Sequence, residues 1–339
     1  MSETAASGRP AKSSPFWRGR TVLVTGGCGF IGSHLVEALL EAGSNVRVLG
    51  KYNSRSDRGF LAGLGNQALE VQLGDVADPW LVQQMARGVD TIFHLAALIG
   101  IPYSYAAPSQ YIETNVNGTL AVLEAARREG VRRVVHTSTS ETYGTAQYVP
   151  IDERHPLVAQ SPYSASKIAA DKLVESYFLS FGLPVTILRP FNTFGPRQSM
   201  RAVVPTLMVQ ALYGREIVVG SLEPVRDMTY VLDTVSGFLS IGAADGVVGE
   251  VFNVGSGRGF TIGEILALVQ RVAGVDKPIR QVEERVRPAG SEVERLVCDF
   301  SRAAASFGYA PDVPLEEGLE KVRDHILANP PDDPARYRV

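Results

Sequence analysis

The sequence has few of the features that mark secreted, membrane-bound or nucleic-acid-binding proteins. Its 339 residues contain two cysteines, Cys28 and Cys298, too few for a disulfide framework, so we expect a reducing, cytoplasmic location. No apolar run approaches the roughly 18 residues that cross a bilayer, and residues 1–15 lack the apolar centre of a secretory signal. The formal net charge of −3 is unlike the basic field of nucleic-acid-binding proteins. We therefore expect neither a membrane nor a nucleic acid as partner.

The sequence also lacks the spacing of metal ligands. Its five histidines show no such pattern, so we predict no metal site. The start of the chain is polar overall and rich in serine and alanine, which predicts a disordered tail over residues 1–17. Hydrophobic residues make up 45% and charged residues 20% of the chain, as in an ordinary globular protein. A chain of this length can bury a large core and form two domains.

Short apolar runs alternate with amphipathic stretches through the first half of the chain. Such alternation produces βαβ units and a parallel sheet covered on both faces. We therefore predict an α/β fold with a doubly wound parallel sheet (Rossmann), and ligands at the carboxyl ends of its strands. The strand-like runs cover residues 22–25, 46–49, 69–73, 91–95, 133–137 and 185–189, and the helical patterns cover residues 33–42, 119–128 and 165–181.

The pattern changes after residue 189, where prolines break the chain into shorter pieces. We predict that residues 18–189 and 228–258 form the dinucleotide-binding Rossmann domain. Residues 190–227 and 259–330 would form a smaller, mixed α/β lobe that binds the substrate. The elements expected to return to the sheet are a helix at residues 231–241 and a strand at residues 251–254.

A glycine-rich turn follows the first predicted strand. Gly26, Gly29 and Gly32 are spaced so that the turn is sharp, the backbone can approach a pyrophosphate, and the next helix packs on the strand. The start of that helix offers unpaired N–H groups and the positive end of its dipole to phosphates. This motif predicts a dinucleotide site.

Tyr163 and Lys167 lie four positions apart and so share one face of a predicted helix. A cation near a phenol favours the phenolate and lowers its pKa from about 10. The lysine ammonium can also donate to ribose hydroxyls. We therefore predict that Tyr163 is a general base toward a substrate hydroxyl.

Taken together, these motifs resemble the extended short-chain dehydrogenase/reductase superfamily, and within it the NAD-dependent nucleotide-sugar epimerases and dehydratases. The resemblance covers roughly residues 20–322. It rests on the glycine turn, Asp75-Val76, the segments 94–97 and 138–143, the pair Tyr163/Lys167, and the stretches 189–197 and 226–231.

The resemblance implies a set of binding residues for a dinucleotide and a nucleotide-diphosphate sugar. Asp75 and Val76 would touch the adenine, and Thr139 would hydrogen-bond the substrate hydroxyl beside Tyr163. Asn192, Arg226 and Arg287 would hold the nucleotide diphosphate. The full set of cofactor-binding residues is Gly26, Gly29, Phe30, Ile31, Asn53, Asp75, Val76, Leu95, Ala96, Ala97, Tyr163 and Lys167.

Ser140 and Glu141 bear on the reaction. The sugar 4,6-dehydratases that the chain resembles usually carry Asp-Glu here, so that the Asp protonates the leaving hydroxyl and the Glu removes a proton. Simple 4-epimerases usually carry small residues at both positions. Enzymes that decarboxylate UDP-glucuronate have Thr-Ser-Glu, as in this chain. Dehydratases of nonulosonic-acid pathways, which residues 101–104 and 291–296 also resemble, share Ser-Glu, so dehydration stays open.

The leading hypothesis from the sequence is a 4-epimerase that works through a transient 4-keto intermediate and converts UDP-glucuronate to UDP-galacturonate. The C6 carboxylate of a uronate cannot leave as water, and Arg197 and Arg201 could bind it. One alternative is a 4,6-dehydratase for UDP- or GDP-N-acetylglucosamine. Another is a non-catalytic protein that senses a dinucleotide.

The second predicted strand ends at Gly50, where an NAD site usually has an acid for the ribose 2′-hydroxyl. Lys51 and Arg55 lie nearby, and Asn53 could bind a hydroxyl. We predict NAD, with NADP as the alternative. The amphipathic stretches 110–128 and 165–181 pair across a two-fold axis in related proteins, which predicts a homodimer.

Overall fold

The computed structural model of the chain describes residues 15–282 and 293–331. The disordered tail predicted for residues 1–17 falls mostly outside the described residues. Its last part was predicted wrongly: Pro15–Trp17 form a short 3₁₀ helix, and the Trp17 side chain is fully buried. The Trp17 ring packs against Phe93 and belongs to the core of the large domain. Its apolar area is enough to hold this segment in place.

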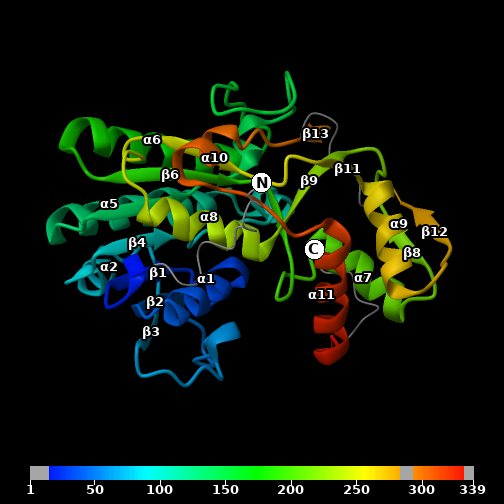
Figure 1. The fold of residues 1–339 in the computed structure, drawn as a ribbon, viewed down its shortest axis with the longest axis horizontal. Coiled ribbons are helices and arrows are strands. Elements are labelled where there is room, and N and C mark those ends of the chain that lie inside the picture. Colours follow the sequence, from blue (N-terminus) through cyan, green and yellow to red (C-terminus); the bar gives the residue numbers. More distant parts are fainter. Residues whose placement is uncertain (1–14, 283–292, 332–339) are drawn as a thin grey trace, which may run out of the picture.

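A parallel sheet of seven strands forms the centre of the larger part of the molecule (Figure 1). From one edge to the other the order is β3-β2-β1-β4-β5-β6-β10, and every neighbouring pair is parallel. The predicted doubly wound fold is thereby confirmed. The strands are β1 (Thr21–Thr25), β2 (Asn45–Lys51), β3 (Leu69–Gly74), β4 (Thr91–His94), β5 (Arg133–Thr137), β6 (Val185–Pro190) and β10 (Val251–Val254).

Helices cover both faces of this sheet. In β1, Val22 and Val24 point into one core and Leu23 into the other, because successive side chains of a strand alternate between faces. All three are completely buried, which explains the continuous apolar run in the sequence. The helices of the first face are α1 (Phe30–Glu41) and α8 (Val231–Ala243), and those of the second are α2 (Pro79–Ala86), α5 (Gly118–Glu129) and α6 (Pro162–Phe181).

The strand order reverses between β1 and β4, since the chain runs outward to β3 and then returns to the other side of β1. Ligands of doubly wound folds bind at such a switch point, beyond the carboxyl ends of the strands. Gly26 follows β1, Leu95 follows β4 and Ser138 follows β5. The topology therefore brings the predicted motifs to one edge of the sheet.

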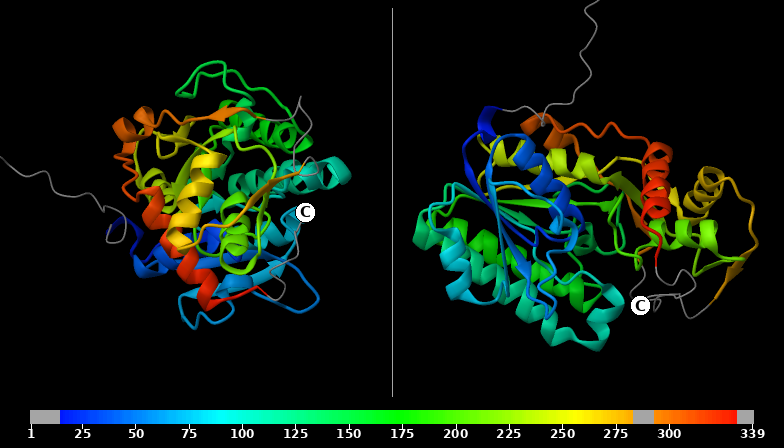
Figure 2. Two further views of the ribbon diagram at one scale, coloured as in Figure 1. Left: turned by 90° about the vertical axis from the view of Figure 1, so that its right-hand side faces the viewer. Right: turned by 90° about the horizontal axis from the view of Figure 1, so that it is seen from below.

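A smaller group of elements lies at one end of the molecule, away from α2 and α5 (Figures 1 and 2). Its core is formed by α7, α9 and α11 with the strands beneath them. These elements are β7 (Asn192–Phe194), α7 (Val203–Tyr213), β8 (Ile217–Val219), β9 (Val225–Tyr230), β11 (Gly259–Thr261), α9 (Ile262–Ala273), β12 (Ile279–Gln281), β13 (Arg295–Leu296) and α11 (Leu315–Ala328).

Short elements complete the described chain. Helix α10 (Ser301–Phe307) packs against β10 of the large sheet. Within residues 15–282 and 293–331, none of the helices combines the length and the apolar character that a bilayer crossing requires. The other short elements are η2 (Gly59–Leu61), α3 (Ile101–Ala106), α4 (Pro108–Tyr111), η3 (Ile112–Asn117) and η4 (Ser140–Tyr143).

Candidate active site

The glycine turn between β1 and α1 has the shape that a pyrophosphate needs. Gly26 has a φ of +74°, and a Cβ at this position would lie 2.8 Å from the backbone nitrogen of Ala96. A Cβ on Gly32 would lie 2.4 Å from the carbonyl oxygen of Gly26. Gly29 caps α1 without a side-chain hydrogen bond, so the first N–H groups of the helix stay available to an anion. This cradle therefore fits the pyrophosphate of a dinucleotide.

The segment 95–97 is held against this turn by buried polar contacts. The Oγ1 of Thr25 lies 2.8 Å from Nδ1 of His94 and accepts a hydrogen bond of 3.2 Å from the backbone N–H of Ala96. Further along, the Asn115 side chain contacts both the N–H and the carbonyl of Leu98, at 2.8 and 3.0 Å. Leu95 and Ala96 thus lie against Gly26 at the switch point, and Ala97 follows them in the chain.

Beyond β3, Asp75 and Val76 lie at the edge where an adenine would lie. Asp75 is exposed, and its Oδ1 accepts a hydrogen bond of 2.9 Å from Ala77. Val76 is buried and packs against Gly118: a Cβ added to Gly118 would lie 2.7 Å from the Val76 side chain. Asp78, rather than Asp75, caps helix α2. The Asp75 side chain is therefore not needed to start this helix.

The end of β2 explains why the expected acid is absent. A Cβ on Gly50 would lie 2.5 Å from the sulfur of Cys28, so the cysteine of the glycine turn occupies the space of any side chain there. Asn53 turns inward to its own loop, where its side chain bonds to the backbone of Arg55 and Asp57 at 2.9 to 3.2 Å. The Asn53 amide is thus used by the loop, and a role toward a ribose would need the loop to open.

Tyr163, Thr139 and Glu141 come together beside the glycine turn from two different elements. Tyr163 is in the first turn of α6, which Ser161 and Ser164 cap reciprocally. Thr139 caps η4, and its Oγ1 accepts a hydrogen bond of 3.2 Å from the N–H of Glu141. Thr139 is also hydrogen-bonded to the Tyr163 phenol, which the Glu141 carboxylate faces electrostatically. These contacts support the predicted assignment of the three residues to one site.

The protein's own groups do not lower the pKa of the Tyr163 phenol, contrary to the expectation from its spacing to Lys167. Burial raises this pKa above its usual value, and the hydrogen bond from Thr139 only partly opposes the rise. The reason is that the ammonium of Lys167 donates to the carbonyl of Thr137, at 2.7 Å. Thr139 is therefore the residue that most directly favours the phenolate.

Lys167 is buried, and its surroundings make the charged ammonium less favourable than it would be in water. Burial lowers the pKa of its ammonium to about 8, while the charge of Asp171 opposes this decrease. A lysine with this pKa is still mostly protonated at neutral pH. It can therefore supply positive charge and hydrogen-bond donors to the site.

On the substrate side, Asn192 is placed well for a ligand. Its Oδ1 is buried and has no hydrogen-bond partner among the described residues. Buried polar atoms are normally paired, so such an atom indicates a missing partner. Arg226 lies on β9, is 6% exposed, and donates to the Val225 carbonyl at 3.0 Å. Arg287 lies outside the described residues.

The two arginines predicted to bind a uronate carboxylate have different surroundings. Arg197 forms an ion pair of 2.7 Å with Glu37 and donates to Ser33 Oγ at 3.1 Å. Its guanidinium thus fastens the loop after β7 to helix α1. Arg201 is exposed, and its charge reaches Tyr111, whose ring packs edge-to-face on Tyr163. Of these two arginines, Arg201 is the one whose charge acts on a tyrosine beside Tyr163.

Several polar residues of the site were not found from the sequence. Asn115 lies in the π-helical turn η3, and its Nδ2 also donates to Ser166 of α6, at 2.9 Å. Asp171 and Arg189 form a buried ion pair of 2.9 Å behind Lys167. The available signal was a polar residue on the apolar face of a predicted helix, which applies to both Asn115 and Asp171.

His136 makes the stability of the protein dependent on pH. Burial lowers its pKa from 6.5 to about 4, so the folded protein does not bind a proton that the unfolded chain binds between these values. The free energy of unfolding should therefore fall as the pH falls through this window, by about 2 kcal/mol between pH 7 and pH 5 from this residue alone. Urea titrations of the wild type and of His136→Gln measure the difference. Equal losses of stability on acidification in the two proteins would contradict it.

Comparison with known proteins places this site in a family. The family model of GDP-mannose 4,6 dehydratase matches residues 23–322. The low-salt glycan biosynthesis protein Agl12 of Haloferax volcanii is 35% identical over 91% of this chain and 99% of its own length.

Two solved structures share the fold over nearly their whole length. DesIV, a dTDP-glucose 4,6-dehydratase from Streptomyces venezuelae solved with NAD bound, has a TM-score of 0.85 and 33% identity, covering 91% of this chain and 97% of that one. UDP-glucuronic acid 4-epimerase from Bacillus cereus, solved with UDP-glucuronic acid and NAD, has a TM-score of 0.82 and 28% identity, covering 91% and 99%. The chain therefore belongs to the GDP-mannose 4,6 dehydratase family of extended short-chain dehydrogenases/reductases.

Proposed function

We propose that the protein is an NAD-dependent nucleotide-sugar 4,6-dehydratase. The observation that carries this proposal is the carboxylate of Glu141, which η4 places beside Thr139 and the Tyr163 phenol. Oxidation at C4 makes the C5 proton acidic, and a carboxylate next to the oxidising residues is suited to remove it. A simple 4-epimerisation needs no base at C5. The presence of Glu141 therefore favours elimination over simple epimerisation.

Tyr163, Thr139 and Glu141 have separate roles in the proposed reaction. NAD, which the glycine turn at Gly26, Gly29 and Gly32 would hold, would supply the hydride acceptor for C4 oxidation and would be regenerated within the same reaction, so no second substrate is needed. Tyr163 takes the proton of the C4 hydroxyl, and the hydrogen bond from Thr139 favours the phenolate. Glu141 removes the C5 proton, the C6–O bond breaks, and a C5–C6 double bond forms as water leaves.

The proton that leaves with the C6 hydroxyl needs a donor. Ser140 is a poor acid and is 2% exposed. Glu141, which has just taken the C5 proton, is the titratable group of η4 that can deliver it. On this proposal one carboxylate does the work that two acids share in the Asp-Glu dehydratases.

Solvent exchange tests this proposal. A reaction in D₂O should place one deuterium at C5 of the product, because the proton that Glu141 removes is replaced from solvent. A 4-epimerase would return an isomer of unchanged mass with no deuterium on carbon. Mass spectrometry of the products from dTDP-glucose, UDP-N-acetylglucosamine and GDP-N-acetylglucosamine distinguishes the two results, and a product without deuterium would reject dehydration.

A second candidate is the UDP-glucuronate 4-epimerase hypothesis. Arg197 no longer supports it, because its guanidinium pairs with Glu37. Arg201 still does, since its charge reaches Tyr111 beside Tyr163, and a structural neighbour acts on UDP-glucuronic acid. If the carboxylate is held by Arg201, Arg201→Ala should lower kcat/KM for UDP-glucuronate by about tenfold to a hundredfold and leave UDP-glucose unaffected. Equal losses for both sugars in a kinetic comparison would count against this candidate.

The alternative of a non-catalytic sensor is wrong. The family members compared are enzymes, and the chain keeps Tyr163, Lys167 and Thr139 in one site. A protein that only sensed a dinucleotide would have no use for this grouping.

We also propose a homodimer formed by α5 and α6, which lie side by side on one face of the sheet. Ile112 and Leu120 are 47% and 39% exposed along η3 and α5, and Leu179 is 73% exposed on α6. These apolar side chains would be covered by the same helices of a second copy, as an isologous interface allows.

Light scattering tests the dimer. The wild type should give twice the mass of one chain at micromolar concentration, and Leu120→Arg should give one chain mass, because a charge would be buried without a partner. Leu327→Arg is the matched control: Leu327 is 52% exposed on α11, far in the fold from α5. A monomeric wild type, or a dimeric Leu120→Arg, would refute this interface.

A further inference from the structure

One buried carboxylate connects the two segments that carry the proposed catalytic residues. Asp171 follows Lys167 by one turn of α6 and is 2% exposed. Its Oδ2 accepts hydrogen bonds from Ser138 Oγ at 2.7 Å and from Arg189 at 2.9 and 3.2 Å. Its Oδ1 lies 3.3 Å from Nε2 of His136. Asp171 thereby ties α6 to β5 and β6.

The contacts continue from Arg189 into η4. Its Nη1 donates to the Tyr143 hydroxyl at 3.0 Å, and Tyr143 in turn donates to Asn253 Oδ1 on β10 at 2.7 Å. Tyr143 is the last residue of η4, and Ser138 directly precedes Thr139. The chain of contacts therefore holds the segment 138–143 at both ends. We call Asp171, Arg189, Ser138 and Tyr143 the brace.

The charges of the brace are nearly balanced. Burial would raise the pKa of Asp171, but the hydrogen bond with His136 and the charges of Arg189 and Lys167 lower it to about 2. The carboxylate is therefore ionised, and Arg189 is protonated beside it. His136 is neutral at physiological pH because burial lowers its pKa to about 4. A balanced buried pair adds little net stability compared with an apolar one, so a role in geometry is the better explanation for keeping it.

We propose that Asp171 and Arg189 are positioning residues, which hold the Tyr163–Lys167 face of α6 and the segment Thr139–Glu141 in one fixed geometry. The Asp171 carboxylate also favours the charged form of Lys167. The proposal deepens the proposed function and rests on its use of Tyr163, Lys167 and Thr139. Catalysis is sensitive to such geometry, since a misplacement of about 1 Å can cost about a hundredfold in rate.

The ionisable groups around Lys167 come from four elements. Asp171 favours the charged ammonium, whereas a proton on His94 or His136 disfavours it. These groups are Tyr163 and Asp171 on α6, His94 on β4, His136 on β5 and Arg189 on β6, with Glu141 of η4 facing Tyr163.

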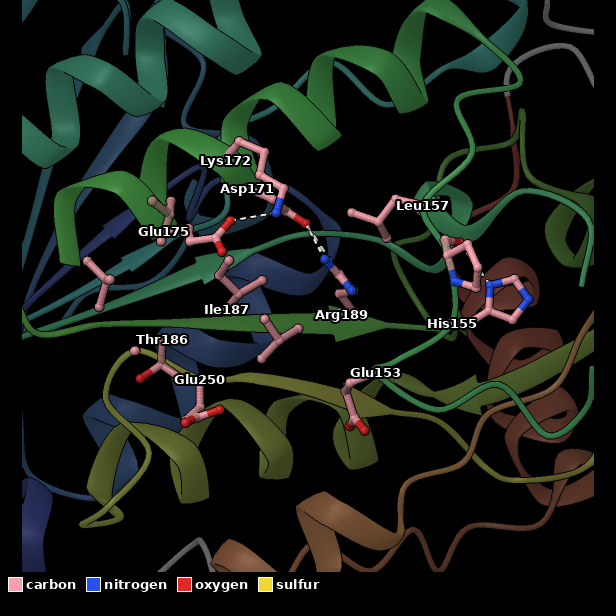
Figure 3. A pocket seen from close by; sticks show the side chains of 15 residues that line it. Glu153, His155, Leu157, Asp171, Lys172, Glu175, Thr186, Ile187, Arg189 and Glu250 are labelled. Atoms are coloured by element: carbon pink, nitrogen blue, oxygen red, sulfur yellow. Dashed lines mark hydrogen bonds and ion pairs between the residues drawn. The ribbon is translucent and has the colours of Figure 1, made fainter. Parts of the chain in front are cut away.

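A pocket of about 350 Å³ gives small ions access to the back of the brace. Figure 3 shows the Arg189 guanidinium directed at Asp171 on its wall, with the carboxylates of Glu153, Glu175 and Glu250 around the space. Glu175 pairs with Lys172 and Glu250 with Arg302, and Glu153 also borders the space that a small cation would enter. The structure therefore permits chemical rescue, in which free guanidinium replaces the side chain removed by Arg189→Ala.

The first experiment measures rescue of Arg189→Ala by guanidinium chloride, at concentrations well below those that unfold proteins. The rate of nicotinamide reduction with dTDP-glucose or UDP-N-acetylglucosamine reports C4 oxidation, and hydrogen exchange of the amides 138–143 reports the brace without activity. We expect kcat to fall about a hundredfold with little change in KM, exchange to accelerate, and guanidinium to reverse both. Sodium chloride at equal ionic strength should reverse neither. The control is Arg302→Ala, which removes the partner of Glu250 at the same pocket but leaves the brace intact.

The second experiment follows kcat against pH in Asp171→Asn, which keeps the shape and removes the charge. Asp171 raises the pKa of Lys167, so its loss lowers that pKa further and should move the alkaline decline of kcat about one unit toward lower pH. Asp171→Glu should restore the wild-type position of this decline.

The proposal is overturned if guanidinium restores the melting temperature of Arg189→Ala but neither kcat nor the protection of residues 138–143. It is also overturned if Asp171→Asn keeps the wild-type pH profile. C4 oxidation precedes both elimination and epimerisation. A wild type that reduces nicotinamide but releases no water therefore contradicts the dehydratase proposal alone, and leaves this test intact.

Discussion

Replacing Tyr163 by phenylalanine is expected to lower kcat by a factor of about 10² to 10⁴, because the substitution removes the group that accepts the proton of the C4 hydroxyl. The fold should be unaffected. The phenylalanine ring can keep its edge-to-face packing on Tyr111, whose ring centre lies 6.2 Å away. Among the described contacts of this side chain, the lost hydroxyl is hydrogen-bonded only to Thr139. NAD binding should also be unaffected. Steady-state kinetics, a melting curve and calorimetry measure kcat, the fold and NAD binding, respectively.

Tyr148→Phe is the matched control. The Tyr148 side chain is 43% exposed, and its hydroxyl donates to Asp152 at 2.7 Å, away from the Thr139–Tyr163 grouping. This variant should keep the wild-type kcat. If Tyr163→Phe retained more than about a third of the wild-type kcat, Tyr163 would not be the general base.

Replacing Glu141 by glutamine should separate the two halves of the reaction. Glutamine has the same shape and keeps the backbone hydrogen bond from residue 141 to Thr139, but it cannot remove a proton. Oxidation at C4 should therefore continue, while elimination falls by about 10² to 10⁴. Rapid mixing would show reduced nicotinamide that accumulates and decays slowly, with no deuterium entering C5 in D₂O.

Glu320→Gln, on the exposed face of α11, is the control for a lost carboxylate and should behave as the wild type. A Glu141→Gln variant that still releases water at the wild-type rate would show that another residue removes the C5 proton. The elimination would then have to be reassigned, while the assignment of Tyr163 would stand.

The parts of the fold that the sequence predicted are those specified by short-range patterns. The strands β1 to β6, the helices α1, α5 and α6, and the glycine turn follow from local alternation and spacing, and α8 and β10 return to the sheet as expected. Tyr163 and Lys167 share a helix face because a helix repeats every 3.6 residues. Their joint site with Thr139 follows from the parallel topology.

The features that were missed depend on contacts between distant residues. The sequence allowed Arg197 to bind a substrate, but in the fold its guanidinium donates to Glu37, 160 positions earlier in the chain. Gly50 lacks the expected acid because Cys28 fills its space, and Lys167 bonds to a carbonyl of β5 instead of polarising the phenol. Trp17 has a defined position because its ring packs against Phe93. None of these partners leaves a periodic signal in the sequence.

The reaction proposed for this site is elimination of water between C5 and C6 of a nucleotide sugar. It can be tested by the proton NMR spectrum of the product formed by the wild-type protein with NAD from dTDP-glucose, UDP-N-acetylglucosamine, GDP-N-acetylglucosamine and UDP-glucuronate. We expect a 4-keto-6-deoxy sugar from one of the first three, recognised by a methyl signal at C6. A product that keeps its C6 oxygen and differs from the substrate only in configuration at C4 would rule out elimination and establish the epimerase.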